Sequence, residues 1–449
     1  MSSDEFSDLR EMLVRAQEPP RDPSHPDAVA ERRRRRRRRI VAGVIALVVV
    51  AASISTYLPL VLLAPVDGPT GAVREPAFEQ PGPVDLSVPP GLASAISVTG
   101  AEEFPATLGT DGLLAVNGDL GELPMASISK IITTLVVLQA KPLGAGEDGP
   151  ILTLSATDED LYDKYFLLGA TVQGMKVGQS LTQHDAIELM LVASASNYAE
   201  LLSTWAYGSQ ARFLSATRAW LAANGLTDTT FVEPTGIDPR NASTAADLVA
   251  IGKLAIATPV IAEIVAMGSF VVPGMNPEPN TNTVLGRSGI TGLKTGNLEE
   301  SGATLLFSAT VEVPGLENPL SIVGVILGGR DRFSLGEGAV DWITSIKSGF
   351  HTVPLVEEGD KLGLLATPWD SAGYVEATGT AALLTWSDTP ITMEMTTTPV
   401  ELGDEDAAAG TISYVAGART ATVPLVVKEP IEGPGGWWRV THPLDLLGK

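Results

Sequence analysis

The chain of 449 residues contains no cysteine. Disulfide bonds, thiolate nucleophiles and cysteine-bound zinc are therefore excluded, and any folded part outside the cell has to be stable through packing alone. Histidine is also scarce, because only His25, His184, His351 and His442 are present, and their spacing matches no H-x-x-x-H metal motif. We therefore expect neither a metal ion nor a histidine-based triad, and solvated or structural roles are favoured for these residues.

Charge is absent from one long stretch near the N-terminus. Ile40–Ala64 contains 25 residues without a charged side chain, and a helix of about 20 apolar residues crosses a hydrocarbon core of about 30 Å. Eight arginines, Arg32–Arg39, stand directly before it, and positive residues stay on the cytoplasmic side. The sequence predicts a cytoplasmic basic tail over 1–39 and a single transmembrane helix over 40–64 in the cell membrane, with the rest outside. A cleaved signal peptide is the alternative, but its apolar region of about 7 to 15 residues is shorter.

The part after residue 64 is strongly acidic. It contains 19 Lys and Arg residues against 45 Asp and Glu residues, a formal net charge of −26. Such a surface repels nucleic acids and other anionic polymers. We expect no nucleic-acid partner, and an anionic substrate would need a local cationic group for binding.

Three regions with different composition and residue pattern follow the apolar stretch. Residues 65–93 are rich in Pro, Gly and acidic residues without a helical period, which is typical of a stalk. Residues 94–350 alternate strand-like and helix-like patterns, which predicts one large α/β domain. Residues 351–449 contain short strand-like runs at regular intervals, which predicts a small β-sandwich-like domain without helices.

Residues Met125–Leu135, MASISKIITTL, place a lysine at the head of an apolar helix. Ser127 and Lys130 share a helix face at a spacing of i and i+3. A serine needs a base to act as a nucleophile, and burial at the positive end of a helix lowers the pKa of a lysine, so that Lys130 can be that base. The alternative is a capping serine followed by a lysine that reaches to water.

Two further segments contain residues of the same chemistry. Lys294, Thr295 and Gly296 precede an apolar strand. A cation, a hydroxyl and a glycine at a strand edge can bind a carboxylate, although a polar turn before a strand has the same composition. Ser194 ends an apolar helix in LMLVASASNYAELL. S-x-x-K, S-D-N and K-T-G occur in this order in class A β-lactamases and penicillin-binding proteins.

The segments PMASISK, LTQHDAIELMLVASASNYAELLSTWAYGS, EPTGIDPRNASTAADL and GLKTG together resemble the penicillin-binding D-alanyl-D-alanine carboxypeptidases. The resemblance covers roughly Leu113–Gly329 and implies a β-lactamase/transpeptidase-like fold, with a sheet flanked by helices and a helical lobe. It also implies removal of the terminal D-alanine from peptidoglycan stem peptides, covalent inhibition by β-lactams, and no cofactor. The residue roles that it implies are Ser127 as acyl-ester nucleophile, Lys130 as general base, Ser194 as proton relay, and Lys294 with Thr295 and Gly296 as the binding site of the terminal carboxylate.

The second motif departs from the family pattern of Ser-x-Asn. Aligned by its flanks, this chain has Ser194, Ala195 and Ser196, and Asn197 falls one position late. We prefer this unshifted alignment, which places Ser196 among the substrate-binding residues. Two alternatives remain open: a catalytically weak penicillin-binding or scaffold protein of the cell wall, and a β-lactamase with Glu233 as its water-activating carboxylate.

Overall fold

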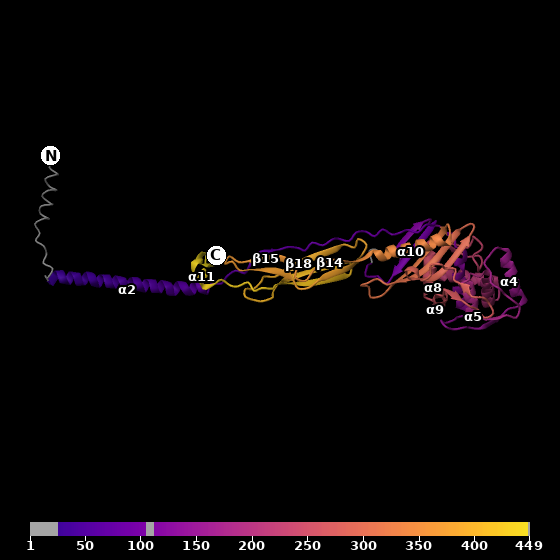
Figure 1. Ribbon diagram of the computed structural model, residues 1–449, viewed down its shortest axis with the longest axis horizontal. Coiled ribbons are helices and arrows are strands. Elements are labelled where there is room, and N and C mark those ends of the chain that lie inside the picture. Colours follow the sequence, from indigo (N-terminus) through magenta and orange to yellow (C-terminus); the bar gives the residue numbers. More distant parts are fainter. Residues whose placement is uncertain (1–25, 105–111, 448–449) are drawn as a thin grey trace, which may run out of the picture.

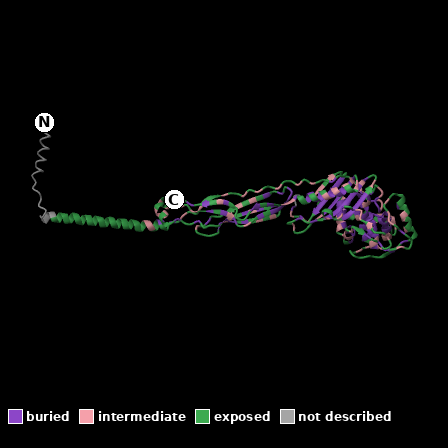
Figure 2. Ribbon diagram, in the orientation of Figure 1, coloured by how far each residue is buried: buried purple, intermediate pink, exposed green. Residues whose placement is uncertain are grey.

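The computed structural model describes residues 26–104 and 112–447. Figure 1 shows an elongated molecule in which helix α2 (Pro26–Leu62) forms one end and a mixed region of helices and strands forms the other. A β-rich region lies between them. Figure 2 shows that burial is concentrated in the mixed region and that α2 is exposed along most of its length. The order of these parts along the molecule separates the apolar helix from the expected catalytic residues.

A five-stranded antiparallel sheet forms the centre of the mixed region. Its order is β11-β12-β13-β2-β3, so β11 and β3 are the edges. The strands are β2 (Ala93–Thr99), β3 (Ala115–Gly118), β11 (Ile290–Leu298), β12 (Gly302–Val311) and β13 (Leu320–Gly329). The expected strands SAISVTG, GLLAVNGD, GATLLFSATVEV and LSIVGVILGG are therefore confirmed within one to three residues at their ends.

Helices and short strands form a lobe on one side of this sheet. The lobe and its connections contain η1 (Ala126–Ile128), α3 (Ser129–Ala140), α4 (Ala156–Leu167), α5 (Gln183–Leu191), α6 (Ser196–Tyr207), α7 (Gln210–Ala223), α8 (Ala245–Ile256), α9 (Pro259–Val265), β4 (Leu123–Pro124), β5 (Ile151–Thr153), β6 (Ser180–Thr182), β7 (Thr229–Thr230), β8 (Ala242–Ser243), β9 (Ser269–Phe270), β10 (Glu278–Pro279) and η2 (Arg287–Gly289). Helix α5 starts with the expected capping box, because the hydroxyl of Thr182 accepts from Asp185 N at 3.0 Å and Thr182 N donates to the Asp185 carboxylate at 2.8 Å.

The two faces of the sheet contact different hydrophobic clusters. Leu306 and Val323 belong to the cluster that includes α3, α5, α6 and α8. Phe307 and Ile322 belong to a second cluster that includes α10 (Arg332–Ser348). Because both faces are buried, β12 and β13 are apolar nearly throughout. The expected α/β architecture, with a sheet flanked by helices and a helical lobe, is thus confirmed.

The β-rich region consists of two sheets that share one hydrophobic cluster. The larger sheet has the order β1-β15-β16-β20-β19-β18, and β14 pairs with β17 in the smaller one. The strands of the β-rich region are β1 (Thr70–Val73), β14 (Phe350–Val356), β15 (Lys361–Ala366), β16 (Ala372–Ala377), β17 (Ala381–Trp386), β18 (Ile391–Thr397), β19 (Ala407–Ala416) and β20 (Arg419–Val427). The expected C-terminal β-sandwich-like region is confirmed.

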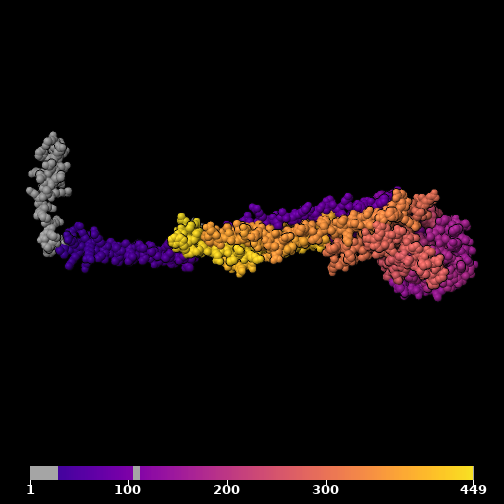
Figure 3. Space-filling model, in the orientation of Figure 1, coloured from indigo at the N-terminus to yellow at the C-terminus, as the bar shows by residue number. Residues whose placement is uncertain are grey.

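Two details differ from the sequence expectation. Residues 65–93 do not form a free stalk, because Thr70–Val73 (β1) pairs antiparallel with β15 and the segment runs along the β-rich region toward the mixed region (Figure 3). Extended backbone that is rich in proline suits an edge strand, which the sequence pattern alone does not distinguish from a stalk. The C-terminal region also contains two short helices, α11 (Gly436–Thr441) and α12 (Pro443–Leu447). Both are too short to show a helical period.

Candidate active site

Ser127 lies in the 3-10 turn η1, directly before α3. Its neighbours Ala126 and Ile128 are buried, whereas Ser127 is partly exposed. Ala126 has a φ of +50°, a region that a residue with a Cβ rarely adopts and that is found where surrounding structure enforces it, often at functional sites. The turn therefore exposes the Ser127 hydroxyl on an otherwise buried segment.

Lys130 is buried completely and contacts this hydroxyl. Its Nζ lies 3.0 Å from Ser127 Oγ and donates to the carbonyl oxygen of Thr235 at 2.7 Å. Burial lowers the pKa of Lys130 from 10.5 to about 7, and the negative charge of Glu233 opposes part of this shift. Lys130 therefore exists in its neutral form in a large fraction of molecules near neutral pH. A neutral amine within hydrogen-bond distance of a serine can accept its proton.

The turn at 233–241 supports Lys130 from the opposite side. The Glu233 carboxylate accepts from the backbone N–H groups of Thr235 at 2.7 Å and Gly236 at 2.5 Å, and from the amide of Asn241 at 3.1 Å. Gly236 has a φ of +83°, and a Cβ there would lie 1.9 Å from the carbonyl oxygen of Ala126. The turn is thus fitted closely to the nucleophile segment. Sequence reasoning missed its support of Lys130, although the Pro-Thr-Gly sequence signals a tight turn.

Glu233 is also the carboxylate considered for a β-lactamase reaction. Among the residues that the structure describes, the Glu233 carboxylate accepts hydrogen bonds only from donors of its own turn, including Asp238 N at 3.3 Å. These donors hold the carboxylate in a structural role. Its position provides no support for water activation.

Lys294, Thr295 and Gly296 lie within the edge strand β11, which directly precedes the expected apolar strand β12. Lys294 is 1% exposed, and its Nζ donates to the carbonyl oxygen of Thr295 at 3.1 Å. Burial lowers the pKa of Lys294 well below its usual value, and the nearby charges of Lys130 and Arg332 lower it further. A bound carboxylate would reverse this effect by stabilising the ammonium form. The electrostatics favour an anionic ligand at Lys294.

Gly296 allows β11 to approach the nucleophile turn. A Cβ at this position would lie 2.3 Å from Thr304 Oγ1, 2.8 Å from Ala126 Cβ and 3.0 Å from Ser127 N. Any side chain would therefore separate the strand from the turn. The first and third motifs are in this way brought together directly, although 169 residues of sequence separate Ser127 from Gly296.

Ser194 and Ser196 lie in the connection between α5 and the start of α6. Ser194 has a φ of +63°, a second strained position, and Ser196 is the first residue of α6. Both are at least 97% buried. Helices α5 and α6 pack against α3, but in the described part of the chain no hydrogen bond joins either serine to Ser127 or Lys130. The structure brings the second motif to the same lobe without a recorded contact to the first.

Asn197 is turned away to a neighbouring loop. Its side-chain oxygen accepts from Gln173 N at 3.2 Å, and its amide nitrogen donates to Gln173 O at 2.7 Å. The adjacent residues hold the same loop, because Ser196 N donates to Thr171 O and the Tyr198 hydroxyl donates to Gly174 O, both at 2.8 Å. Asn197 is completely buried with both amide atoms paired. This geometry favours the alignment in which Ser196 occupies the position of the family's asparagine.

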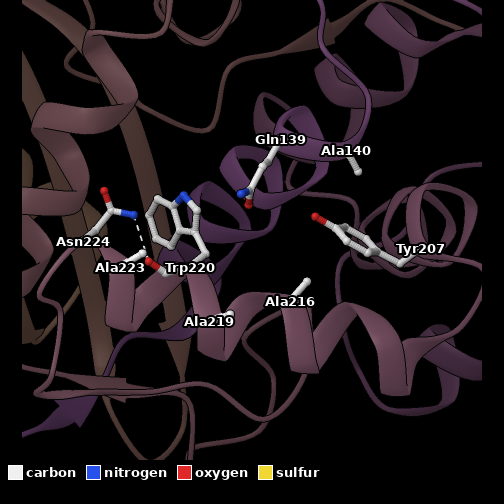
Figure 4. A pocket seen from close by; sticks show the side chains of 8 residues that line it. All are labelled: Gln139, Ala140, Tyr207, Ala216, Ala219, Trp220, Ala223 and Asn224. Carbon is white, nitrogen blue, oxygen red and sulfur yellow. Dashed lines mark hydrogen bonds between the residues drawn. The ribbon is translucent and has the colours of Figure 1, made fainter.

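A cavity lies elsewhere in the helical lobe. It has a volume of about 740 Å³ and lies between the end of α3, α6 and α7, where Figure 4 shows Tyr207, Trp220 and Asn224 with a series of alanines. The amide of Asn224 donates to the carbonyl oxygen of Trp220 at 2.8 Å. None of the three motifs lines this cavity. We therefore place the candidate active site at Ser127 and leave the cavity without an assignment.

Known solved structures share this fold. The penicillin binding protein 5 of Haemophilus influenzae matches with a TM-score of 0.51 at 17% identity, over 78% of this chain and 98% of that chain. A peptidoglycan synthesis regulatory factor, PBP3, of Streptococcus pneumoniae matches with a TM-score of 0.50 at 19% identity, over 77% and 100%. At these identities the match supports the fold alone.

Sequence comparison finds similar proteins. D-alanyl-D-alanine carboxypeptidase DacC of Escherichia coli is 28% identical over 346 residues, which cover 73% of this chain and 84% of the relative. D-alanyl-D-alanine carboxypeptidase DacB2 of Mycobacterium tuberculosis is 31% identical over 193 residues, which cover 41% and 62%. The profile of the D-alanyl-D-alanine carboxypeptidase family matches residues 110–328, which include all three motifs. Over residues 110–328 the chain is similar to the D-alanyl-D-alanine carboxypeptidase family.

Proposed function

We propose that this protein is a serine carboxypeptidase that removes the terminal D-alanine from peptidoglycan stem peptides through an acyl-enzyme on Ser127. The observation that carries the proposal is the buried amino group of Lys130, 3.0 Å from Ser127 Oγ and with a pKa of about 7. A base whose pKa lies near the working pH is the arrangement that general base catalysis favours. The similarity to this family supports the choice of a D-Ala-D-Ala peptide as the substrate.

The proposed mechanism has two stages. Neutral Lys130 accepts the Ser127 proton while Oγ attacks the carbonyl carbon of the penultimate D-alanine, and backbone N–H groups, including that of Ser127, stabilise the oxyanion. The proton passes through the Ser194 hydroxyl to the leaving amine, so that free D-alanine departs and an ester remains on Ser127. Lys130 then accepts a proton from water, whose oxygen attacks the ester carbonyl, and returns this proton to Ser127 Oγ as the ester bond breaks and the shortened peptide leaves.

Lys294 and Thr295 bind the terminal carboxylate of the substrate in this proposal. The chain after residue 64 has a net charge of −26, so a diffuse field would repel a peptide with a carboxylate. A buried ammonium beside a hydroxyl supplies the local attraction that the surface does not. Gly296 keeps this strand close enough to Ser127 for one peptide to contact both.

A catalytically weak penicillin-binding protein is the second candidate. The specific observation in its favour is Ser196, because a serine hydroxyl is shorter than the asparagine amide of the family and Asn197 is committed to Gln173. Both candidates predict that a β-lactam acylates Ser127. They differ in turnover, since only the carboxypeptidase releases D-alanine at a useful rate.

We propose the following organisation for the chain: a cytoplasmic tail over 1–39, a membrane helix over 40–64, an extended segment over 65–93, a serine peptidase domain over 94–350 and a β-rich domain over 351–449. Helix α2 is long and apolar enough to cross a membrane, and the arginines before its apolar part favour an outside location for the catalytic part. Protease added to intact protoplasts should digest the chain after residue 64. Protection of that part would overturn the orientation.

The test of function uses a fluorescent penicillin and a D-Ala-D-Ala peptide with the full-length protein. We expect the adduct on Ser127 by mass spectrometry, no labelling of Ser127→Ala, and slower labelling of Lys130→Ala by roughly 10² or more through loss of the base. Lys347→Ala, at an exposed position on α10, is the control for the loss of a lysine. An adduct on another serine would refute the site, and labelling without release of D-alanine would favour the second candidate.

A further inference from the structure

The hydroxyl group of Thr295, to which the proposed function assigns carboxylate binding, is paired with a second hydroxyl group. Thr295 Oγ1 donates to Thr281 Oγ1 at 2.8 Å. Thr281 lies in the connection between β10 and η2, outside the three sequence motifs. Thr295 is 4% exposed, whereas Thr281 is partly exposed. The proposed carboxylate site therefore contains two adjacent hydroxyl groups.

The backbone on both sides of Thr281 is held by asparagine side chains. The Asn280 amide donates to the carbonyl oxygen of Met267, just beyond α9, at 2.8 Å. Asn282 is 4% exposed, and its amide donates to the carbonyl oxygen of Gly292 in β11 at 3.4 Å. The sequence Asn-Thr-Asn thus fixes this segment to α9 on one side and to β11 on the other. Thr281 is in this way placed firmly beside Thr295.

Thr281 also contacts the segment that leads to the second motif. Its backbone N–H donates to the carbonyl oxygen of Val192 at 3.3 Å. Val192 is the last residue at the end of α5 and precedes the strained Ser194 by two positions. Thr281 therefore bonds to β11 through its side chain and to the end of α5 through its backbone. The second and third motifs are joined through this one residue.

The pair of hydroxyl groups can serve a carboxylate in only one arrangement. A threonine hydroxyl donates one hydrogen bond and accepts others, whereas an ionised carboxylate only accepts. Thr295 therefore has to turn its proton from Thr281 toward a bound carboxylate. Thr281 can then donate its own proton to Thr295 Oγ1, so that the bond between the two residues is kept in the reverse direction. Hydrogen bonds in such a chain polarise and strengthen one another.

We propose that Thr281 is a positioning residue for the terminal carboxylate of the substrate, because its hydroxyl sets the direction of the Thr295 O–H bond and polarises it. This inference rests on the proposed function of Lys294 and Thr295. The charge of Lys294 attracts any anion, whereas the pair of threonines supplies a direction. Thr281 therefore contributes to the selection of peptides that end in a free carboxylate over peptides whose end is blocked.

The test compares two thioester substrates that share the same acyl-D-alanyl group. The thiol leaving group ends in a carboxylate in one substrate and in a carboxamide in the other. The full-length protein contains no cysteine, so the released thiol can be measured without background, and kcat/KM reports acylation. In Thr281→Val, kcat/KM should fall about tenfold for the carboxylate substrate, the effect of one lost hydrogen bond, and change less than about twofold for the carboxamide. Thr281→Ser should keep the parent values.

Thr291→Val is the matched control. Thr291 Oγ1 lies 2.9 Å from Ser308 Oγ, so the same kind of hydroxyl pair is removed from the same strand, β11, at its other end. Both substrates should react with this variant as with the parent protein. Thr281→Ala should show the same selective loss as Thr281→Val, so that a folding defect of the valine variant does not decide the result.

Each outcome decides one part of the argument. An equal fall for both substrates in Thr281→Val and Thr281→Ala would mean that Thr281 only supports its segment, and it would overturn the positioning role. Unchanged rates for both substrates would overturn it as well. A parent protein that releases no thiol from either substrate and takes up no penicillin would instead refute the proposed function itself.

Discussion

The rate of Ser127 acylation should rise with pH to a plateau, with a midpoint near 7. Only neutral Lys130 can accept the Ser127 proton, and burial lowers its pKa from 10.5 to about 7. The neutral fraction is therefore about one tenth at pH 6, about one half at pH 7 and nearly complete at pH 9, whereas a lysine with a pKa of about 10.4 would be neutral in about one molecule in 2,500 at pH 7. The rate should rise about tenfold per pH unit below the midpoint.

Glu233 provides a second test of this argument. Its negative charge raises the pKa of Lys130 and so opposes the effect of burial. Glu233→Gln removes the charge and keeps one oxygen, which can still accept from Gly236 N and the Asn241 amide as Oε1 does, whereas the bond from Thr235 N to Oε2 is lost. The midpoint should therefore move to lower pH, with a plateau rate close to that of the parent protein.

The assay is the second-order rate of labelling by a fluorescent penicillin between pH 5 and 9, measured by quenched time points on gels. Lys347→Ala should reproduce the parent profile, and Lys130→Ala should give a low rate that varies little with pH. A midpoint near 10 would mean that burial does not make Lys130 a base at neutral pH. A Glu233→Gln midpoint above that of the parent would contradict the assigned direction of the charge effect.

Four further substitutions test separate parts of the site. Ser196→Asn should raise the acylation rate roughly tenfold, about the value of one hydrogen bond in a dry site, whereas Asn197→Ala should lower protease resistance through loss of the loop contact more than it lowers the initial rate. Gly296→Ala should reduce acylation about 10² or more, because its Cβ would lie 2.3 Å from Thr304 Oγ1 and would move β11 away from the nucleophile. Lys130→Met should raise Tm more at pH 6 than at pH 9.5: a lowered folded pKa makes Lys130 costly to stability below pH 7, and this cost fades as pH rises toward 10.5. Labelling rates check Ser196→Asn and Gly296→Ala, limited proteolysis beside the labelling rate checks Asn197→Ala, and thermal unfolding at both pH values checks Lys130→Met.

Features that depend on neighbouring residues were predictable from the sequence. Apolar runs such as 302–311 indicate a strand with both faces buried, and Ser127 and Lys130 are close because they are three residues apart at the start of a helix. The apolar residues of α3 predict that Lys130 is buried, and burial lowers its pKa so that it can act as a base. Such local patterns carried the prediction of the sheet, the helical lobe and the nucleophile with its base.

Features that depend on distant partners were not predictable. The partner of β1 is β15, almost 300 residues later in the chain, and a four-residue segment with two prolines nearby has no pattern that selects it. The carbonyl oxygen of Thr235 that accepts from Lys130 lies 105 residues away in sequence. Arg439 and Ala64, which bond at the end of α2, are separated by 375 residues of sequence. Each of these contacts is fixed by tertiary packing and not by propensity.

The second motif combines the two situations. A local alignment offers Ser196 or Asn197 as the residue that faces the substrate, and the letters alone do not choose between them. The partner of Asn197 supports the unshifted alignment, because the backbone of Gln173, 24 residues upstream, satisfies both atoms of its amide. An amide that is buried and fully paired cannot also bind a peptide without breaking those bonds. Three consecutive residues of α6 hold the loop at 171–174, and we therefore propose that Asn197 supports this loop and that Ser196 takes the place of the family's asparagine.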